Sequence, residues 1–336
     1  MAAYTTIDNP ELYFQVKTYA GNGTAIGSGG QAITLDGDEN MQPDLVWIKD
    51  RTDGDRPRWF DSSRGATIEF DTSDTTAETT LSEGLTAFGS NGFTVGNHEG
   101  VNSSGDNFVA WCWKESATAG FDIITWSGNE TQKTISHNLS AVPHWIIVKV
   151  RGTAKQWTCY HKDMTADPDN AGIFLQSTAV PTTGTAGYFG NTAPTSSVFT
   201  VGTSTNVNQN SDNVMGYCWT GKQGFSKFGS YEGNGGNHFI YTGFSPAWVM
   251  IKKIDDTHDW HIFDNKRDAY NERDSWLEAN TSNAEATSSN YVVDFLSNGF
   301  KTGSGSGLNG SGETFIYMCF ADAPFVNSNG VPCNAR

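Results

Sequence analysis

One sequence pattern occurs three times along the 336 residues and constrains the fold more than any other feature. A proline, one variable position, four apolar residues and a lysine recur at 43–49, 143–149 and 246–252, with prolines 100 and 103 positions apart. A segment of about 100 residues is long enough to bury a core of its own. The spacing therefore predicts three tandem structural units, each with its own core.

Four further markers accompany this run in the same order in every unit. They are the Gly-Asn turns at 21–22, 128–129 and 233–234; the Trp-led segments 59–61, 157–159 and 260–262; the segments 90–93, 196–199 and 297–300; and the aromatic-cysteine runs 110–113, 216–219 and 317–320. The third of these markers reads Ser-Asn-Gly-Phe in the outer copies but Ser-Ser-Val-Phe in the middle one. Five markers repeated in one order indicate a triplicated module.

The markers predict strands and turns. The proline-led run is too short for a helix, and its β-branched and aromatic content is typical of a buried strand. The run 108–113 follows the turn-forming segment 104–107 and predicts a second strand. The Gly-Asn marker is typical of a hairpin turn. We therefore predict an all-β fold of three tandem β-sandwich-like repeats of about 100 residues each.

The repeats set the domain boundaries, and the ends of the chain lie outside them. We predict an N-terminal arm (1–12), unit 1 (13–116), unit 2 (117–222), unit 3 (223–325) and a C-terminal tail (326–336). Ends of this kind are often ordered only against a partner. The lysine that closes each proline-led run (Lys49, Lys149 and Lys252) is expected to mark the exit of the strand into solvent.

The five cysteines do not have the paired spacing of a zinc site, and their odd number argues against a disulfide framework. Cys112, Cys218 and Cys319 lie in apolar aromatic runs, which predicts small buried hydrophobic side chains. The acidic segment 35–40 lacks the ligand spacing of an EF-hand and predicts a solvated turn. The sequence thus suggests no metal site.

No catalytic constellation recurs. Asp61 and Arg64 have counterparts in Asp264 and Arg267, but the middle unit lacks the pair, so we interpret both pairs as ion pairs that fix a loop. Nucleophile-elbow, P-loop and dinucleotide motifs are missing. A glycoside-cleaving enzyme would need two carboxylates about 5–10 Å apart, and the sequence nominates none. We expect no catalytic residues and no cofactor.

The eleven tryptophans, together with many Ser, Thr, Asn and Gly residues, give a composition found in carbohydrate-binding surfaces. Most of these tryptophans lie in apolar runs, which predicts burial. Trp59, Trp126 and Trp276 are the candidates for an exposed ligand platform.

The net charge of −16 disfavours binding to nucleic acid, because phosphates are repelled. No apolar run approaches the length of about 18 residues that membrane insertion requires. The first residues lack the basic and apolar regions of a signal peptide.

Several segments resemble one group of viral proteins. Residues 6–15, 41–49 and 284–287, and Ser-Asn-Gly-Phe followed by the run 109–114, resemble the tandem-repeat structural proteins of marine tailed bacteriophages over residues 6–325. The resemblance implies a virion component of the fibre, tail or capsid-surface type, without assigned catalytic residues.

From the residues and the resemblance together, we expect a non-enzymatic virion protein on the particle surface, either a capsid decoration or a short head or tail appendage. Its partners would be other copies of itself, in a homo-oligomer, and other virion proteins. It would assemble in the host cytoplasm. The alternative is a tail fibre or receptor-binding module that recognises host surface polysaccharide.

Overall fold

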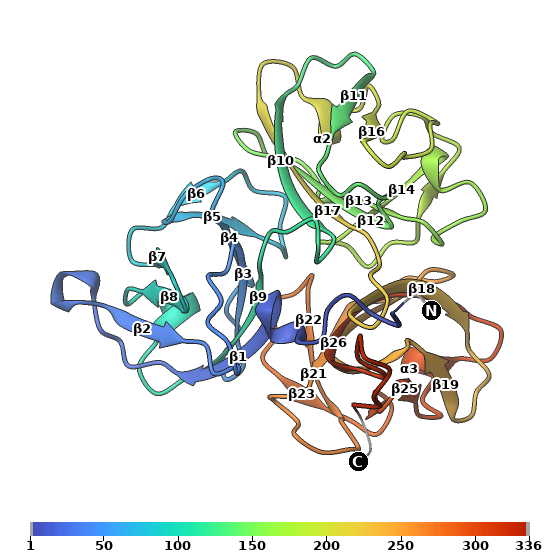
Figure 1. Ribbon diagram of the computed structural model, residues 1–336. Helices are drawn as coiled ribbons and strands as arrows, with labels where there is room; N and C mark the ends of the chain where they lie inside the picture. The colour runs from blue at the N-terminus through green and yellow to red at the C-terminus, as the bar shows by residue number, and fades with distance from the viewer. Residues whose placement is uncertain (1–2, 334–336) are drawn as a thin grey trace.

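The computed structural model describes residues 3–333 and confirms the all-β prediction. Three β-rich lobes surround a common centre, coloured blue, green and orange along the chain (Figure 1). Helices are limited to short turns: α1 (Glu99–Asn102), α2 (Thr205–Asn208), α3 (Ser306–Asn309), η1 (Pro10–Leu12), η2 (Ile26–Ser28) and η3 (Pro168–Asn170).

Each lobe contains one antiparallel sheet of six strands. In unit 1 the strand order is β1 (Phe14–Ala20), β9 (Asn107–Trp113), β3 (Leu45–Asp50), β4 (Arg58–Asp61), β5 (Ile68–Asp71) and β6 (Thr79–Thr80). In unit 2 it is β10 (Phe121–Ser127), β17 (Asn213–Trp219), β12 (Trp145–Val150), β13 (Thr158–His161), β14 (Ala171–Phe174) and β15 (Thr182–Thr183). In unit 3 it is β18 (Ser226–Glu232), β26 (Thr314–Pro324), β20 (Phe244–Lys253), β21 (Trp260–Asp264), β22 (Ser275–Glu278) and β23 (Ala286–Thr287).

A smaller sheet accompanies each large one. The small sheets are β2 (Gln31–Thr34), β8 (Gly92–Val95) and β7 (Leu85–Gly89) in unit 1; β11 (Lys133–Ser136) and β16 (Val198–Val201) in unit 2; and β19 (His238–Tyr241), β25 (Gly299–Thr302) and β24 (Val293–Leu296) in unit 3. All strands of one large sheet lie within one predicted unit, and the three large sheets share one strand order. The residue boundaries of the units stay a prediction.

Both faces of the large sheet are buried, which explains the runs of consecutive apolar residues. In β3, Leu45 and Trp47 point to the centre of the molecule, whereas Val46 and Ile48 point to the small sheet of unit 1. The same alternation places Cys112 of β9 in the outer layer. A strand with no solvent face therefore shows a run of consecutive apolar residues in place of apolar-polar alternation.

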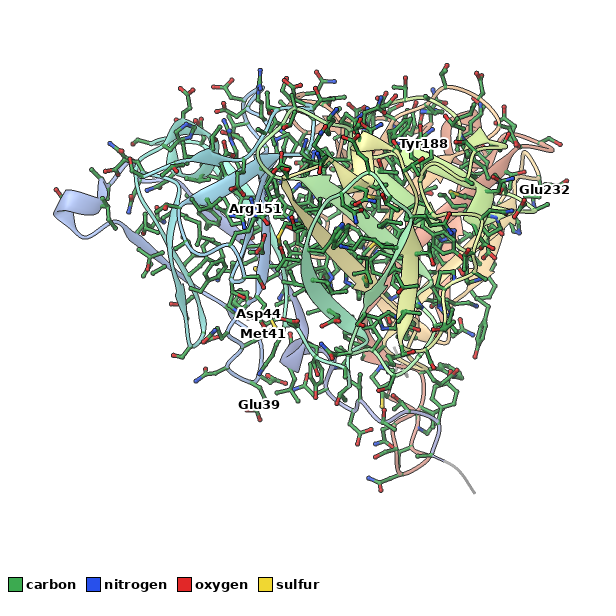
Figure 2. All side chains as sticks on the ribbon, turned by 90° about the horizontal axis from the view of Figure 1, so that it is seen from above. Glu39, Met41, Asp44, Arg151, Tyr188 and Glu232 are labelled. Carbon is green, nitrogen blue, oxygen red and sulfur yellow. The ribbon has the colours of Figure 1, made fainter. Side chains whose placement is uncertain are left out.

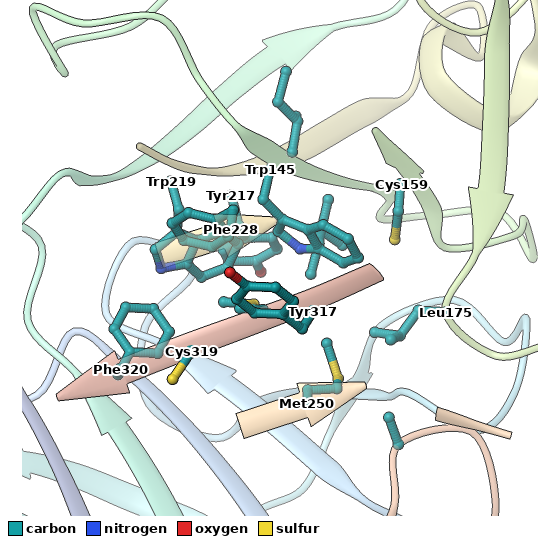
Figure 3. Packing of buried hydrophobic residues seen from close by; sticks show 14 of the residues in the cluster. Trp145, Cys159, Leu175, Tyr217, Trp219, Phe228, Met250, Tyr317, Cys319 and Phe320 are labelled. Atoms are coloured by element: carbon teal, nitrogen blue, oxygen red, sulfur yellow. The ribbon is translucent and has the colours of Figure 1, made fainter. Parts of the chain in front are cut away.

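The central core is shared, which corrects the expectation of a separate core for each unit. One cluster of buried side chains includes residues of all three units, and only the outer layer of unit 1 forms a second cluster. Figure 3 shows Trp145 and Tyr217 of unit 2 gathered with Met250 and Tyr317 of unit 3. The rings of Trp113 and Trp248, from units 1 and 3, meet edge to face at 5.7 Å. Such pairs stabilise beyond the area that they bury.

The aberrant marker of the middle unit has a structural counterpart. In unit 1, Ser-Asn-Gly-Phe forms the turn between β7 and β8, where a Cβ on Gly92 would lie 2.0 Å from the carbonyl oxygen of Ile33. Unit 2 has Val198 at this register position, and its small sheet consists of two strands. There the Thr195 hydroxyl accepts the N–H groups of Ser197 and Val198 and organises the turn.

The three Trp-led segments 59–61, 157–159 and 260–262 do not occupy equivalent positions in their strands. The strand register pairs Leu45 with Asp61, Trp145 with His161 and Trp248 with Asp264. Trp157 and Trp260 therefore correspond to Pro57, and Trp59 corresponds to Cys159. The apolar pattern does not reveal this shift, because a displacement of two residues leaves each side chain on the same face of its strand.

The N-terminal arm packs on unit 3 of its own chain. Thr5 Oγ1 donates to the Gln223 carbonyl at 2.7 Å, and Ile7 is buried in the shared core. Asp8 accepts hydrogen bonds from the backbone N–H and the hydroxyl of Ser328, which joins the arm to the C-terminal tail. The predicted arm and tail also include residues 1–2 and 334–336, which lie outside the described residues.

Candidate functional site

The three tryptophans suggested as ligand platforms lie in different surroundings. Trp59 is 1% exposed in the central core. Trp126 is 8% exposed and its ring packs against that of Phe199. Neither ring offers a free face to a ligand. Trp276 is half-buried and packs against Tyr291 with ring centroids 4.5 Å apart. The structure does not bring the three together at one site.

The ion pairs predicted from Asp61–Arg64 and Asp264–Arg267 are confirmed. Arg64 Nε donates to Asp61 Oδ2 at 2.5 Å, and Arg267 Nε donates to Asp264 Oδ2 at 2.6 Å, with all four side chains buried. Burial of an ion pair is tolerated only when the remaining polar atoms are also hydrogen-bonded. Arg64 Nη2 and Arg267 Nη2 donate to the Trp59 and Ile262 carbonyls of their own units at 2.9 and 2.8 Å, and the neighbouring units supply further partners for the carboxylates.

Both pairs lie at contacts between units. The Tyr217 hydroxyl of unit 2 donates to Asp61 at 2.7 Å, and the Trp111 indole N–H of unit 1 donates to Asp264 at 3.1 Å. Trp111 and Tyr217 occupy corresponding positions, one residue before a cysteine of the aromatic runs. The pairs therefore fix one unit against the next as well as a loop within one unit.

Each pair extends to a glutamate and an arginine. Arg151 of unit 2 binds Glu78 of unit 1 with two hydrogen bonds of 2.7 and 2.9 Å, and Glu78 lies 3.8 Å from Arg64. Figure 2 shows Arg151 where the blue strands of unit 1 meet the green strands of unit 2. Between units 3 and 1, Glu285 accepts from Arg51 at 2.8 and 3.0 Å and from Arg267 at 2.8 Å.

The prediction that the repeated lysines reach solvent is wrong. Lys49, Lys149 and Lys252 are 0% exposed. Each ammonium group donates to a loop carbonyl of another unit: Lys49 to Ser282 at 3.2 Å, Lys149 to Thr75 at 2.8 Å and Lys252 to Thr178 at 3.1 Å. The lysines thus tie the three units in a ring, unit 1 to unit 3, unit 2 to unit 1 and unit 3 to unit 2.

Burial shapes the ionisation of these lysines. Removal from water disfavours the ammonium form and lowers the pKa of Lys149 to about 7 and those of Lys49 and Lys252 to about 8. Carboxylates near each lysine act in the opposite direction. This burial was not predictable from the sequence, because a lysine that ends an apolar run more often extends into water.

A further repeated residue was missed in the sequence. Asn102, Asn208 and Asn309 end the short helices α1, α2 and α3. Their side-chain carbonyls accept the backbone N–H of Asn22, Asn129 and Asn234, the asparagines of the Gly-Asn markers. The dipeptides Val101-Asn102, Val207-Asn208 and Leu308-Asn309, each shortly before an aromatic-cysteine run, could have revealed it.

The cysteines agree with the sequence analysis. Cys112, Cys218 and Cys319 are buried and unpaired, which confirms their prediction as small hydrophobic side chains. Burial raises the pKa of each of these thiols. Residues 3–333 contain no group of three or more His, Cys, Asp or Glu side chains placed to hold a metal ion.

The candidate site that the structure does present is a cleft of about 870 Å³ in unit 3. Its walls are the outer ends of β20 and β26, the turn between β24 and β25, and the loop 265–274 that follows β21. This loop is longer than its counterparts in unit 1 (62–67) and unit 2 (162–170). The strands β20 and β26 also extend beyond the bounds of their counterparts. The cleft therefore arises from features particular to unit 3.

Polar groups and one exposed ring line this cleft. Tyr270 stands at 85% exposure on the loop 265–274. The Arg273 guanidinium lies 4.4 Å from the centre of the Phe295 ring. Asn271 accepts from the Phe295 N–H at 3.0 Å and donates to the Phe295 carbonyl at 2.9 Å, which ties the loop to β24. The lining thus combines an exposed aromatic ring with hydrogen-bonding side chains.

The chain belongs to the family called Domain of unknown function (DUF7483), which matches residues 9–324. The match runs once across all three large sheets, so the whole body defines the family. No curated protein matches the sequence. Among the described residues, no helix has both the length and the apolar character needed to cross a membrane.

Proposed function

We propose that this chain is a non-enzymatic structural protein of a bacteriophage virion, displayed on the particle surface as a capsid decoration or a short head or tail appendage. The sequence resemblance over residues 6–325 suggests this class. The observation that carries the proposal is that the repeated aromatic and lysine markers lie inside the body, where they join the units. The repeated sequence thus serves to build a rigid body that presents its surface.

The charge of the chain fits this role. A net charge of −16 keeps displayed copies soluble and mutually repelling until a specific contact forms. Assembly would then use defined surfaces toward other copies of the chain and other virion proteins.

Location in an intact particle tests the proposal. Negative-stain electron microscopy of phage particles, with an antibody raised against this chain, should place label on the shell or at the junction of head and tail. Label only at the tail tip would favour the receptor-binding alternative, and particles that carry no label would refute a virion role.

A further inference from the structure

We propose that the unit 3 cleft binds a neutral saccharide, with Tyr270 as the stacking surface and Asn265 and Arg273 as hydrogen-bonding partners of its hydroxyl groups. The inference goes beyond the structural role proposed above, because sugar binding is a property of the isolated chain. It assigns the ligand site to residues other than the tryptophans that the composition suggested.

The size of the cleft suits such a ligand. Its volume of about 870 Å³ lies within the range of about 300–1,000 Å³ found for small-molecule sites. The cleft is open to solvent rather than enclosed, and its walls come from the surface loop 265–274 and from strand ends. An open cleft accommodates one part of a longer chain of sugars.

Tyr270 supplies an apolar face. At 85% exposure it is the most exposed large apolar side chain of residues 3–333. A ring that stands in water gains by covering its face, and the C–H face of a sugar ring is a flat partner for it.

The floor of the cleft carries unsatisfied polar atoms of both kinds. Asn265 Oδ1 is a buried acceptor without a hydrogen-bond partner, and Arg273 Nε is a buried donor without one. Arg273 as a whole is 7% exposed. An unpaired buried polar group is costly, so a ligand that meets it gains affinity. A hydroxyl group both donates and accepts, so the hydroxyls of a sugar offer a donor to Asn265 Oδ1 and an acceptor to Arg273 Nε.

The floor is held in place before a ligand arrives. Asn271 bonds the Phe295 backbone in both directions and accepts from Arg273 Nη1. The Phe295 ring supports the plane of the guanidinium. Because the loop and the arginine are already fixed, binding orders few further groups.

The charges favour a neutral ligand over an acidic one. Arg273 lies in the field of Asp264, Asp268, Asp294 and Asp322. Lys266, the other cation of the cleft, lies 3.7 Å from Asp36. A carboxylate on the ligand would therefore meet cations that already have acidic neighbours, within a chain of net charge −16.

Binding to the purified full chain tests the inference. Maltotriose, cellotriose, mannotriose, chitotriose and one uronic-acid oligomer are screened by saturation-transfer NMR and titrated by calorimetry. We expect at least one neutral oligosaccharide to bind. Tyr270→Ala and Asn265→Ala should each weaken binding about tenfold, the factor that corresponds to one lost stacking or hydrogen-bond contact.

Two controls make the result specific. Asp167→Ala alters an exposed residue of the corresponding loop in unit 2 and should leave binding unchanged. Lys266→Ala should change the affinity less than twofold, and added salt should have no effect. Thermal unfolding of every variant checks that Asn265→Ala remains folded, and the exposed Tyr270 can be truncated without loss of core packing.

Three results would overturn the inference. They are the absence of binding by every neutral oligosaccharide at millimolar concentration, undiminished binding to Tyr270→Ala, or salt-sensitive binding of the uronic-acid oligomer that Lys266→Ala abolishes. None of them bears on particle imaging, so failure of this inference and failure of the virion proposal can be told apart.

Discussion

Unit 1 contacts both of its neighbours through buried Asp–Arg pairs and the glutamates beside them, whereas the contact between units 2 and 3 has uncharged groups at the corresponding positions. Where units 1 and 3 have the Asp–Arg pairs, unit 2 has His161 and Met164. The register of the strands places His161 opposite Trp145, as Asp61 lies opposite Leu45. The three interfaces thus share a backbone geometry and differ in chemistry.

The partners of these residues differ in the same way. Met318 of unit 3 stands where units 1 and 2 have Trp111 and Tyr217, and its side chain has no N–H or O–H to donate. His161 Nε2 instead bonds the Tyr317 carbonyl at 3.3 Å, while its Nδ1 accepts the Asp163 N–H at 3.1 Å. This pattern fixes a neutral imidazole with its proton on Nε2.

Glu78 and Glu285, which bond arginines across the two charged interfaces, have no counterpart between units 2 and 3. Glu78 and Glu285 donate their backbone N–H to the carbonyls of Arg151 and Arg51 in the adjoining units. At the corresponding positions units 2 and 3 have Pro181, which has no N–H, and Ile254. A buried ion pair and an apolar contact of similar volume contribute comparable stability. A buried charge without its partner is costly, so the Asp–Arg pair, the glutamate and the second arginine are expected to be present together or replaced together at one interface.

The largest effect should come from breaking one charged interface. Asp264→Ala leaves Arg267 buried with its nearest carboxylate removed and deprives the Trp111 N–H of its acceptor. We expect a loss of about 3–5 kcal/mol in the free energy of unfolding, measured by urea denaturation. Asp38→Ala, on an exposed loop, serves as the control and should change stability by less than about 0.5 kcal/mol.

A double substitution sharpens this test. Asp264→His with Arg267→Met copies unit 2 into unit 3 and removes both charges together. The double variant should lose less than half of what Asp264→Ala loses, since no charge is left unpaired. An equal loss would contradict the view that the two chemistries are interchangeable.

Acid should weaken the uncharged interface through His161. Burial lowers the pKa of His161 to about 3, below the usual value of 6.5. As the pH falls, the imidazole is therefore protonated in the unfolded chain at a higher pH than in the folded protein. Its contribution to stability is complete above about pH 6.5 and is lost as the pH falls toward 3. Between pH 6.5 and about 4.5 the loss should be about 2–3 kcal/mol.

The difference between wild type and His161→Gln isolates this contribution, because the carboxylates common to both cancel. Denaturation at the two pH values measures it. Parallel pH curves for the two proteins would exclude His161 as the source. His261, whose pKa burial also lowers to about 3, gives an independent replicate within unit 3.

Raising the pH should increase the free energy of unfolding through the buried lysines that connect the units. The folded-state pKa of Lys149, about 7, lies below the usual 10.5, so the unfolded chain binds more protons between these values and stability rises with pH. From pH 7 to 9 we expect a gain of about 2 kcal/mol from this residue. Lys149→Met should flatten that part of the curve in denaturation measurements, and an unchanged slope would count against a neutral amine in the folded state.

The smallest expected losses in stability come from substituting the glutamate at each of the two charged interfaces. Glu285 bonds both of its arginines at 2.8–3.0 Å, whereas Glu78 lies 3.8 Å from Arg64. Glu285→Gln should cost about 2 kcal/mol and Glu78→Gln about 1 kcal/mol, because only the former loses close bonds to two cations. Thermal unfolding of the two variants side by side gives the order, and the reverse order would show that distance does not set it.

Local sequence was sufficient to predict much of the fold. Runs such as Leu45 to Ile48 and the turn residues around them predicted strands, and the departure of Ser-Ser-Val-Phe marked the unit whose small sheet differs. The burial of Cys112 and the pairing of Asp61 with Arg64 followed from neighbours close in the chain. Each of these predictions depends on residues within a few positions of one another.

The candidate site could not be predicted in the same way. Tyr270, Arg273 and Asn265 belong to a loop that is longer than its counterparts in the other units, and they meet residues of β24 and β26 only after the sheets have formed. Trp59 and Trp126 drew attention by composition, yet both are buried. Composition alone does not distinguish a ring used for packing from one used for binding.

Turn chemistry and apolar runs act over a few residues, so strands in a threefold pattern of markers are predictable without any structure. The meeting of the three inner sheet faces in one core, and the burial of Lys49, Lys149 and Lys252 between units, follow from long-range packing instead. The reason is that solvent exposure of a strand depends on what packs against it, and here the packing partner is another unit: the lysine contacts join residues 74 to 233 positions apart.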